Sequence, residues 1–254
     1  MAHVAVLIAL LRIRRLLMNS KRGRIDRFLA SRLQIPSRQA QQLIRQGEVL
    51  LNGAAVTQVN IIINEFTRIE CQGQLLQALA PAYWMLHKPA GVVSATSDAE
   101  QQTVMSLLPE IAQTQQLHIA GRLDKYTTGL LLLTNDSRWS EAIAQPSASK
   151  RKHYRVTLQN PLTDDYVSAF RDGFYFEFEN ITTAPAELTI VSDYIADVVL
   201  TEGKYHQIKR MFGRFRNPVV ALHRYQIGQI VLDDNLALGE ARELRADEIA
   251  SVVI

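Results

Sequence analysis

The sequence predicts an α+β protein of two domains: a small N-terminal module of two helices and a hairpin, then a larger domain with a mixed sheet. Three observations lead to this prediction. The chain has 254 residues, more than one domain usually holds. Hydrophobic residues make up 47% of it and charged residues 21%, the balance of an ordinary globular protein. Helical spacing dominates the first block, whereas strand-like runs with interspersed helices dominate the second.

The N-terminus is expected to form a poorly ordered extension over residues 1–23. Its apolar run at residues 4–11 is too short to cross a bilayer, and the basic cluster follows this run, whereas a signal peptide places its charges first. Met18 is the expected start of the folded unit, and the alternative for residues 1–17 is a short docked helix. Cys71, the only cysteine, excludes an internal disulfide and favours a reducing compartment. We therefore expect a cytoplasmic protein without membrane contact.

The first domain is expected to span residues 24–70. Apolar residues at helical spacing predict an amphipathic helix over residues 24–33. Ser37 is the expected N-cap of a second helix, which Gly47 ends in the left-handed conformation. Asn52-Gly53 between two apolar runs then predicts a tight hairpin, and a strand-like run before residue 71 completes the module.

Charge is distributed unevenly along the chain and points to a polyanionic partner. Residues 1–70 carry a net charge of +7, and the remaining residues carry −4. The segment SRQAQQLIRQGEVLLNG at residues 37–53 resembles the S4 RNA-binding domain. This resemblance implies that Arg38 and Arg45, on the polar face of the second helix, donate hydrogen bonds to RNA phosphates. The alternative is a helix face that is merely solvated.

The second domain is expected to span residues 83–254, after a linker at residues 71–82 that lacks strand alternation. Its order of elements indicates a mixed sheet in an α+β arrangement. The expected strands are Tyr83 to Leu86, Gly129 to Thr134, His153 to Leu158, Ala186 to Val191 and Ala196 to Thr201. The expected helices cover residues 137–144, 163–171 and 205–215.

The segment GRLDKYTTGLLLLTND at residues 121–136 carries the strongest functional signal. Asp124 lies in a polar turn that leads directly into an apolar strand. A carboxylate at the mouth of a buried strand is rigid and partly desolvated, as a nucleophile must be. Considered alone, an Asp in a turn is more often a local turn former.

This segment resembles the signature of the RNA pseudouridine synthases, in which the Asp of GRLD is the catalytic nucleophile. The resemblance therefore assigns that role to Asp124. It extends over nearly the whole chain from residue 24 onward. The segments that carry it are HKPAGVVSAT at 87–96, KHYRVTL at 152–158, EGKYHQIKRMF at 202–212 and LHRYQIGQIVL at 222–232.

The implied reaction detaches uracil from its ribose, rotates it and rejoins it through carbon, so nothing is oxidised or consumed. A carboxylate that forms and then breaks a covalent bond needs neither metal nor organic cofactor. In agreement, the sequence contains no glycine-rich phosphate loop, no HExxH and no cysteine cluster. Whether Asp124 attacks the sugar or the pyrimidine ring is left open.

Tyr154 and Lys152 are candidate site residues on one predicted strand. The resemblance places the Tyr154 ring against the target base, and stacking of this kind tolerates any base. Lys152 shares the strand face of Tyr154 by period 2, which makes it a candidate for contact with RNA phosphate. A tyrosine packed in a core is the alternative for Tyr154.

A basic helix and a neighbouring arginine complete the expected site. Ile208, Met211, Phe212 and Phe215 form an apolar stripe. The resemblance makes Lys209 the charge partner of Asp124, where many relatives have Arg, and a nearby cation favours the ionised carboxylate. Arg210 and Arg122 are candidate RNA-binding residues. A surface charge is the alternative for Lys209, and a structural ion pair is the alternative for Arg122.

Within the family, the N-terminal module, GRLDKYTTG and GKYHQIKRMF resemble the RsuA branch, which implies 16S rRNA as substrate, at uridine 516. The expected partner is 16S rRNA or a small-subunit assembly intermediate, bound by a monomer. The alternatives are a 23S rRNA enzyme of the same family and a non-catalytic ribosome-assembly protein. A glycosidic-bond hydrolase needs two cooperating carboxylates, and Asp136 lies a strand's length from Asp124.

Overall fold

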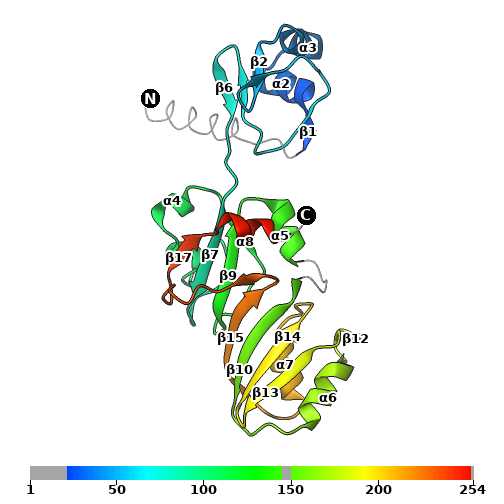
Figure 1. Ribbon diagram of the computed structural model, residues 1–254, viewed down its shortest axis with the longest axis vertical. Coiled ribbons are helices and arrows are strands. Elements are labelled where there is room, and N and C mark those ends of the chain that lie inside the picture. The colour runs from blue at the N-terminus through cyan, green and yellow to red at the C-terminus, as the bar shows by residue number, and fades with distance from the viewer. Residues whose placement is uncertain (1–21, 145–149, 253–254) are drawn as a thin grey trace. The chain divides into compact units, whose positions relative to one another are not determined.

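The computed structural model describes residues 22–144 and 150–252, and its contacts divide the chain into two compact units at Pro81 and Ala82 (Figure 1). The expected extension at residues 1–23 lies almost wholly outside the described residues; Gly23 belongs to the first described strand. No described helix is both long enough and apolar enough to pass through a bilayer.

Two helices form one side of the first unit, namely α2 (Ile25–Leu33) and α3 (Ser37–Arg45). Ala40 and Ile44, one turn apart on α3, are fully buried, whereas Arg38 and Arg45 are exposed. Pro36, and not Ser37, precedes the first residue of α3, and no side chain caps this end. A fixed proline φ is suited to the entrance of a helix, which explains the difference from the expected serine cap.

A small sheet covers the helices of the first unit, with strand order β3-β2-β5-β6. The hairpin at Asn52-Gly53 is confirmed, since β2 pairs antiparallel with β3 across these two positive-φ residues. The segment Gln74–Gln77, expected within the linker, instead forms strand β6 against β5, because Leu76 packs into the core of this unit. The other strands are β1 (Gly23–Arg24), β2 (Val49–Leu51), β3 (Ala54–Ala55), β4 (Ile62–Ile63) and β5 (Ile69–Cys71).

The second unit is built on a nine-stranded mixed sheet, which confirms the expected fold class. Seven strands run in the order β13-β14-β10-β15-β9-β7-β17, while β16 pairs with β15 and β8 pairs with β9. Among these pairs only β9 and β15 are parallel. The strands are β7 (Tyr83–Lys88), β8 (His118–Ala120), β9 (Thr128–Thr134), β10 (Lys152–Leu158), β13 (Glu187–Ser192), β14 (Ile195–Leu200), β15 (Val219–Ile227), β16 (Ile230–Val231) and β17 (Ala241–Glu243).

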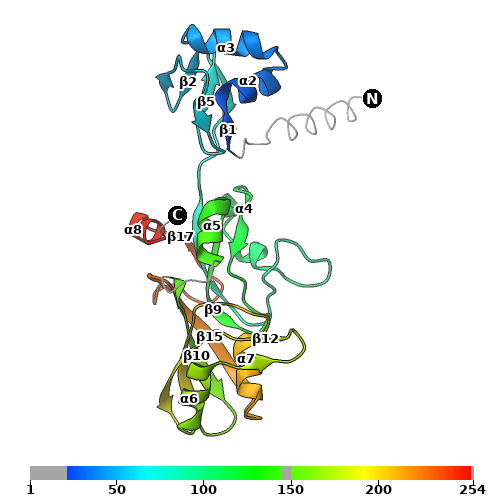
Figure 2. The same cartoon turned by 90° about the vertical axis from the view of Figure 1, so that its right-hand side faces the viewer.

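Helices cover both faces of this sheet, so β9 is buried on both sides. Leu131 and Leu133 join the core beneath α6 and α7, whereas Leu130 and Leu132 join the core beneath α5. Figure 2 shows α4 and α7 on one side of the sheet and α8 on the other. The remaining elements are η1 (Val104–Leu107), α4 (Glu110–Gln113), α5 (Ser137–Ala144), α6 (Asp165–Asp172), the hairpin strands β11 (Tyr175–Phe176) and β12 (Ile181–Thr182), α7 (Gln207–Gly213) and α8 (Ala246–Ala250).

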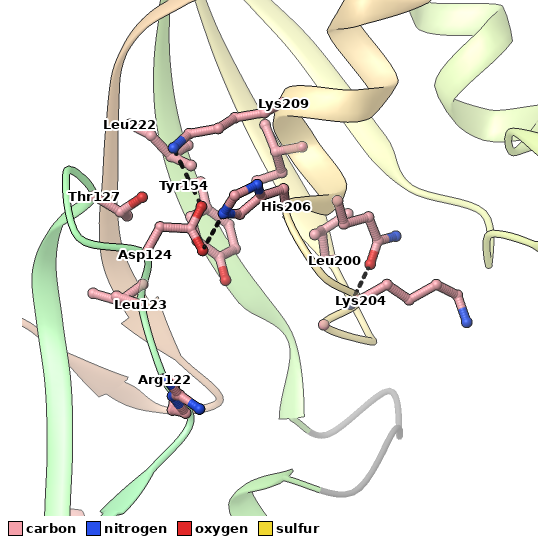
Figure 3. A pocket seen from close by; sticks show the side chains of 13 residues that line it. Arg122, Leu123, Asp124, Thr127, Tyr154, Leu200, Lys204, His206, Lys209 and Leu222 are labelled. Carbon is pink, nitrogen blue, oxygen red and sulfur yellow. Dashed lines mark hydrogen bonds and ion pairs between the residues drawn. The ribbon is translucent and has the colours of Figure 1, made fainter. Parts of the chain in front are cut away.

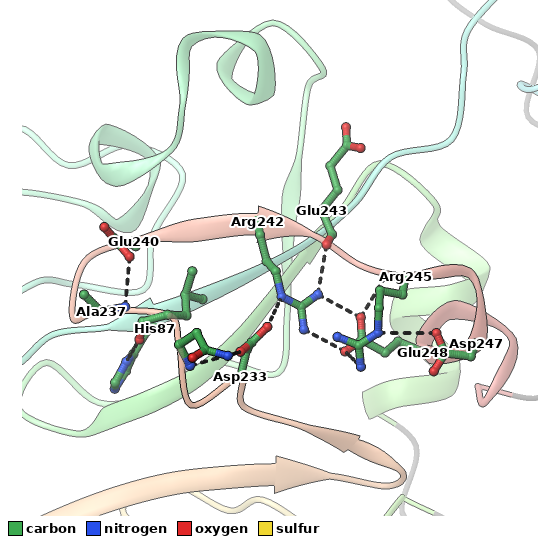
Figure 4. Close-up of polar contacts among 11 residues, drawn as sticks. His87, Asp233, Ala237, Glu240, Arg242, Glu243, Arg245, Asp247 and Glu248 are labelled. Atoms are coloured by element: carbon green, nitrogen blue, oxygen red, sulfur yellow. Dashed lines mark hydrogen bonds and ion pairs between the residues drawn. The ribbon is translucent and has the colours of Figure 1, made fainter.

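A cluster of charged side chains fastens the C-terminal helix to the edge of the sheet (Figure 4). Arg242 on β17 makes two hydrogen bonds with Glu248 on α8, at 2.8 and 2.9 Å, and a third with Asp233 at 2.8 Å. These contacts hold the pKa of the Glu248 carboxyl below its usual value. Since every partner in this cluster is satisfied by another protein group, we assign it a structural role.

Candidate active site

Asp124 lies in the turn between β8 and β9, where the side chains of Lys209 and His206 face its carboxylate (Figure 3). Lys209 Nζ is 3.3 Å from one carboxylate oxygen, and His206 Nε2 is 3.5 Å from the other. Ion pairs with this degree of exposure contribute only about 0–1 kcal/mol to stability. The arrangement is therefore better explained by the orientation that it gives to the Asp124 carboxylate than by stability.

A buried lysine holds the backbone of this turn in place. Lys88, at the end of β7, is fully buried, and its ammonium donates to the carbonyls of Pro89, Lys125 and Thr127 at 2.9 to 3.0 Å. Burial lowers the pKa of Lys88 to about 8, and the charge of Asp124 opposes this shift. Lys88 is thus still mostly charged at neutral pH, and all three of its protons are used by backbone oxygens.

Arg224 on β15 fixes the two ends of the same segment. It is 1% exposed and donates to Gly121 O at 2.7 Å and to Leu130 O at 3.0 Å. Gly129 pairs with Arg224 across the parallel strands, and a Cβ at Gly129 would stand 2.1 Å from the Arg224 carbonyl oxygen. Only glycine fits this approach, which explains the glycine that follows the turn. Ser94 Oγ adds a contact by donating to Leu123 O at 2.8 Å.

Helix α7 and the residue before it position the two side chains that face Asp124. Ile208, Met211 and Phe212 are buried in the core, as the predicted stripe requires, and the helix is shorter than the expected residues 205–215. Burial of such side chains contributes about 1.5–3 kcal/mol each, more than the ion pair, so packing sets the position of Lys209. His206 is the N-cap residue of this helix, and its backbone is left-handed, with φ 48°.

Tyr154 shares the pocket with Asp124 and Lys209, so the structure brings the three expected catalytic residues together. The ring is 7% exposed and forms part of the wall. Lys152 lies two residues earlier on the same buried face but is only 5% exposed. Burial and the nearby Arg224 lower the pKa of Lys152. These facts argue against the expected phosphate contact by Lys152, because period 2 places it inside with Tyr154.

The other expected RNA-binding residues lie in different surroundings. Arg122 is exposed at the rim of the pocket, and no ion pair of its side chain is found among the described residues. Arg210 donates to both Glu179 carboxylate oxygens at 2.6 Å and stacks over Phe176, 3.7 Å from the ring centre. Its donors therefore serve the β11–β12 hairpin, and an RNA role for either arginine stays a prediction.

Sequence reasoning did not single out His206, Lys88 or Arg224 as parts of the site. His206 lies next to the apolar stripe of α7 in the sequence, and a lone histidine offers no spacing signal. Lys88 and Arg224 are polar types that are rarely buried fully, so nothing local to them predicts 0% and 1% exposure. In the described part of the chain, no group of three or more His, Cys, Asp or Glu residues is placed to hold a metal ion.

Comparison with known proteins agrees with this geometry. The family model described as RNA pseudouridylate synthase matches residues 82–213, and the S4 domain model matches residues 23–69. A solved structure described as a pseudouridylate synthase is 39% identical, covers 91% of this chain and 99% of its own, and aligns with a TM-score of 0.65.

Curated relatives extend the agreement. A protein of Pseudomonas aeruginosa named ribosomal small subunit pseudouridine synthase A is 46% identical over 230 residues, which is 90% of this chain and 100% of the relative. A protein of the same name from Vibrio cholerae is 41% identical, over 90% of this chain and 99% of its own length. The fold and the site define an RNA-modifying enzyme with a separate RNA-binding unit. The chain belongs to the RNA pseudouridine synthase family and carries an N-terminal S4 domain.

Proposed function

We propose that this enzyme converts one uridine of 16S rRNA, uridine 516, to pseudouridine, with Asp124 as the nucleophile. The observation that carries the proposal is the Asp124 carboxylate held between Lys209 and His206 in a pocket that also contains Tyr154. The small-subunit target follows from the names of the relatives, which are small-subunit pseudouridine synthases. We further propose that the enzyme acts as a cytoplasmic monomer on 16S rRNA or on a small-subunit assembly intermediate.

The pocket supplies what the exchange of bonds requires. The target uridine leaves its stack and enters beside Tyr154, whose ring packs against the base. Asp124 then forms a covalent bond with the sugar or with the pyrimidine ring. The bond from ribose to N1 breaks, the uracil rotates, and a bond from ribose to C5 forms. The proton lost from C5 is balanced by the one gained at N1, and the carboxylate is released unchanged.

Lys209 and His206 have separate parts in this scheme. Lys209 brings its ammonium within 3.3 Å of one Asp124 oxygen, and an opposite charge at this distance favours the carboxylate over the acid. His206 approaches the second carboxylate oxygen, which leaves the carboxylate a fixed orientation. Lys209 lies in the first turn of α7 and His206 is the N-cap residue directly before it, so one short segment sets their spacing.

Exposed donors on the S4 unit are expected to hold the RNA without taking part in the chemistry. Arg38 and Arg45 lie on the exposed face of α3, where phosphates have free access. Contacts of this kind position the substrate and do not read its sequence.

The experiment compares wild type with Asp124→Asn on 16S and 23S rRNA transcripts and on small-subunit particles. Wild type is expected to form one pseudouridine in 16S rRNA, whereas Asp124→Asn binds the RNA without detectable product, because the amide keeps the size but is not a nucleophile. Site-resolved mass spectrometry after pseudouridine-specific derivatisation measures the product. Asp234→Asn, a change at an exposed loop carboxylate, is the matched control.

Three results would contradict the proposal. If Asp124→Asn forms product in a single turnover, with deamidation excluded, Asp124 is not the nucleophile. If the enzyme modifies only 23S rRNA, the proposal that 16S rRNA is its substrate is wrong. Release of free uracil would show that the enzyme hydrolyses the glycosidic bond and does not isomerise the uridine, since isomerisation leaves the RNA mass unchanged.

A further inference from the structure

Thr127 carries a hydroxyl that the proposed mechanism does not use. The residue is 1% exposed and lies in the wall of the pocket that contains Asp124. Among the described residues, its Oγ1 is the buried side-chain polar atom without a hydrogen-bond partner. A buried polar group without a partner is costly, and in a native structure it calls for an explanation.

The backbone fixes this hydroxyl relative to the nucleophile. The Thr127 amide donates to Asp124 O at 3.0 Å, which closes the turn between the two residues. The Thr127 carbonyl accepts from buried Lys88 at 3.0 Å. Figure 3 shows the Thr127 oxygen on the side of the residue that faces Asp124 and Lys209. The backbone that carries the hydroxyl is therefore held in place next to Asp124.

The other buried walls of the pocket offer the substrate little polarity. Leu200, Leu222 and Ile208 are apolar and at most 8% exposed. Gln207 is buried, but its amide is used by Glu202 and by the Lys204 backbone. The charged residues, Asp124 and Lys209 among them, are less buried. Among these buried side chains, Thr127 therefore offers a hydroxyl that no described protein group uses.

We propose that Thr127 Oγ1 donates a hydrogen bond to a carbonyl oxygen of the target uracil and keeps this contact through the isomerisation. The rotation that exchanges N1 for C5 also interchanges the two uracil carbonyls and leaves N3–H on the rotation axis. A fixed donor that faces one carbonyl before the rotation therefore faces the other afterwards.

Such a contact retains the detached base while no bond joins it to the RNA. It makes Thr127 a substrate-binding residue and not a structural one. The inference rests on the proposed function only in that the enzyme must convert a uridine in the pocket of Asp124.

The first test compares wild type with Thr127→Val and Thr127→Ser in single-turnover reactions on a 16S rRNA fragment. Thr127→Val keeps the shape and removes the hydroxyl, so kcat/KM is expected to fall about tenfold. Thr127→Ser keeps the hydroxyl and is expected to stay within about threefold of wild type. Equal losses in both variants, or no loss in Thr127→Val, would overturn the proposal.

Thermal unfolding of the free protein separates binding from structure. Thr127→Val removes an unpartnered polar atom, so its Tm is expected to equal or exceed that of wild type. The matched variant is Thr128→Val, whose hydroxyl lies 2.9 Å from His223 Nδ1 and whose Tm is expected to fall. A drop in Tm for Thr127→Val as large as that for Thr128→Val would assign the hydroxyl a structural role instead.

The second test changes the substrate. RNA with 2-thiouridine or 4-thiouridine at the target offers one carbonyl as a weak acceptor. With one of these two substrates, the rate ratio of wild type to Thr127→Val is expected to collapse from about tenfold to about one. A ratio that stays unchanged with both would contradict the carbonyl contact. If wild type converts no uridine at all, the proposed function fails, whereas equal rates on an RNA that wild type converts refute this inference alone.

Discussion

Basic side chains are used in opposite ways in the two units of this protein. Around the turn of Asp124, Lys88 and Arg224 are buried and donate to backbone carbonyls. On α3 of the S4 unit, Arg38 and Arg45 stand exposed to solvent. Buried cations paired with neutral carbonyls are shielded from salt, whereas exposed ones respond to it. The charge of a residue type thus says little about its task until its burial is known.

The largest effect is expected for Lys88→Met, which removes three hydrogen bonds at a fully buried site. Three carbonyls lose their donor, so the free energy of unfolding is expected to fall by about 3 kcal/mol, and kcat falls with it because the turn loosens. Urea unfolding and single-turnover rates measure the two effects. The control is Lys125→Met in the same turn, expected to change stability by less than about 0.5 kcal/mol. Equal stability of both variants would show that the turn does not need its buried support.

A smaller effect is expected for Arg224→Met, because two short hydrogen bonds and a long one at 3.5 Å are lost. The free energy of unfolding is expected to fall by about 2 kcal/mol, with kcat reduced more than KM is raised. Arg155→Met, a change at the exposed pair with Asp197, serves as the matched variant on the adjacent strand and should cost about 0–1 kcal/mol. A loss confined to KM would mean that Arg224 acts on the RNA instead of on the turn.

The smallest effect on the fold is expected for Arg38→Gln combined with Arg45→Gln. Stability should change by less than about 0.5 kcal/mol per site and kcat should hold, while RNA affinity falls and its dependence on salt flattens. Binding titrations at several salt concentrations provide the measurement, with Arg171→Gln on α6 as a control for the loss of one exposed arginine outside the S4 unit. An unchanged slope would indicate that the exposed face of α3 does not touch phosphate.

Periodic segments were predicted well from the sequence, and segments whose burial depends on distant partners were not. The helices at α3 and α5 and the strand at β9 have clear spacing, and the structure confirms them. Strand β15 was missed because His223, Arg224 and Gln226 interrupt its apolar pattern. Each of these polar residues is accommodated by a group on another element or by a turn, and such partners leave no mark on the local sequence.

The site shows the same division. The motif resemblance placed Asp124, Tyr154 and Lys209 in one pocket, and the structure brings them there. His206 and Thr127 gain meaning only from their distances to Asp124 or from the absence of a described partner. Lys152 was misjudged because alternation tells which face a strand residue occupies but not whether that face is open.

The support that Arg224 gives to the catalytic turn has a consequence for biosynthesis. Arg224 lies 103 positions after Gly121, whose carbonyl it holds, so a nascent chain that has emerged only as far as β14 already contains Asp124 and Tyr154 without the strand that fixes the turn. The strands of the S4 unit, by contrast, are complete at Gln77. At about 5–20 residues per second, roughly 7 to 30 seconds separate the synthesis of Gln77 from that of Arg224. The S4 unit, which is expected to bind RNA, can therefore fold well before the catalytic unit is able to convert a uridine.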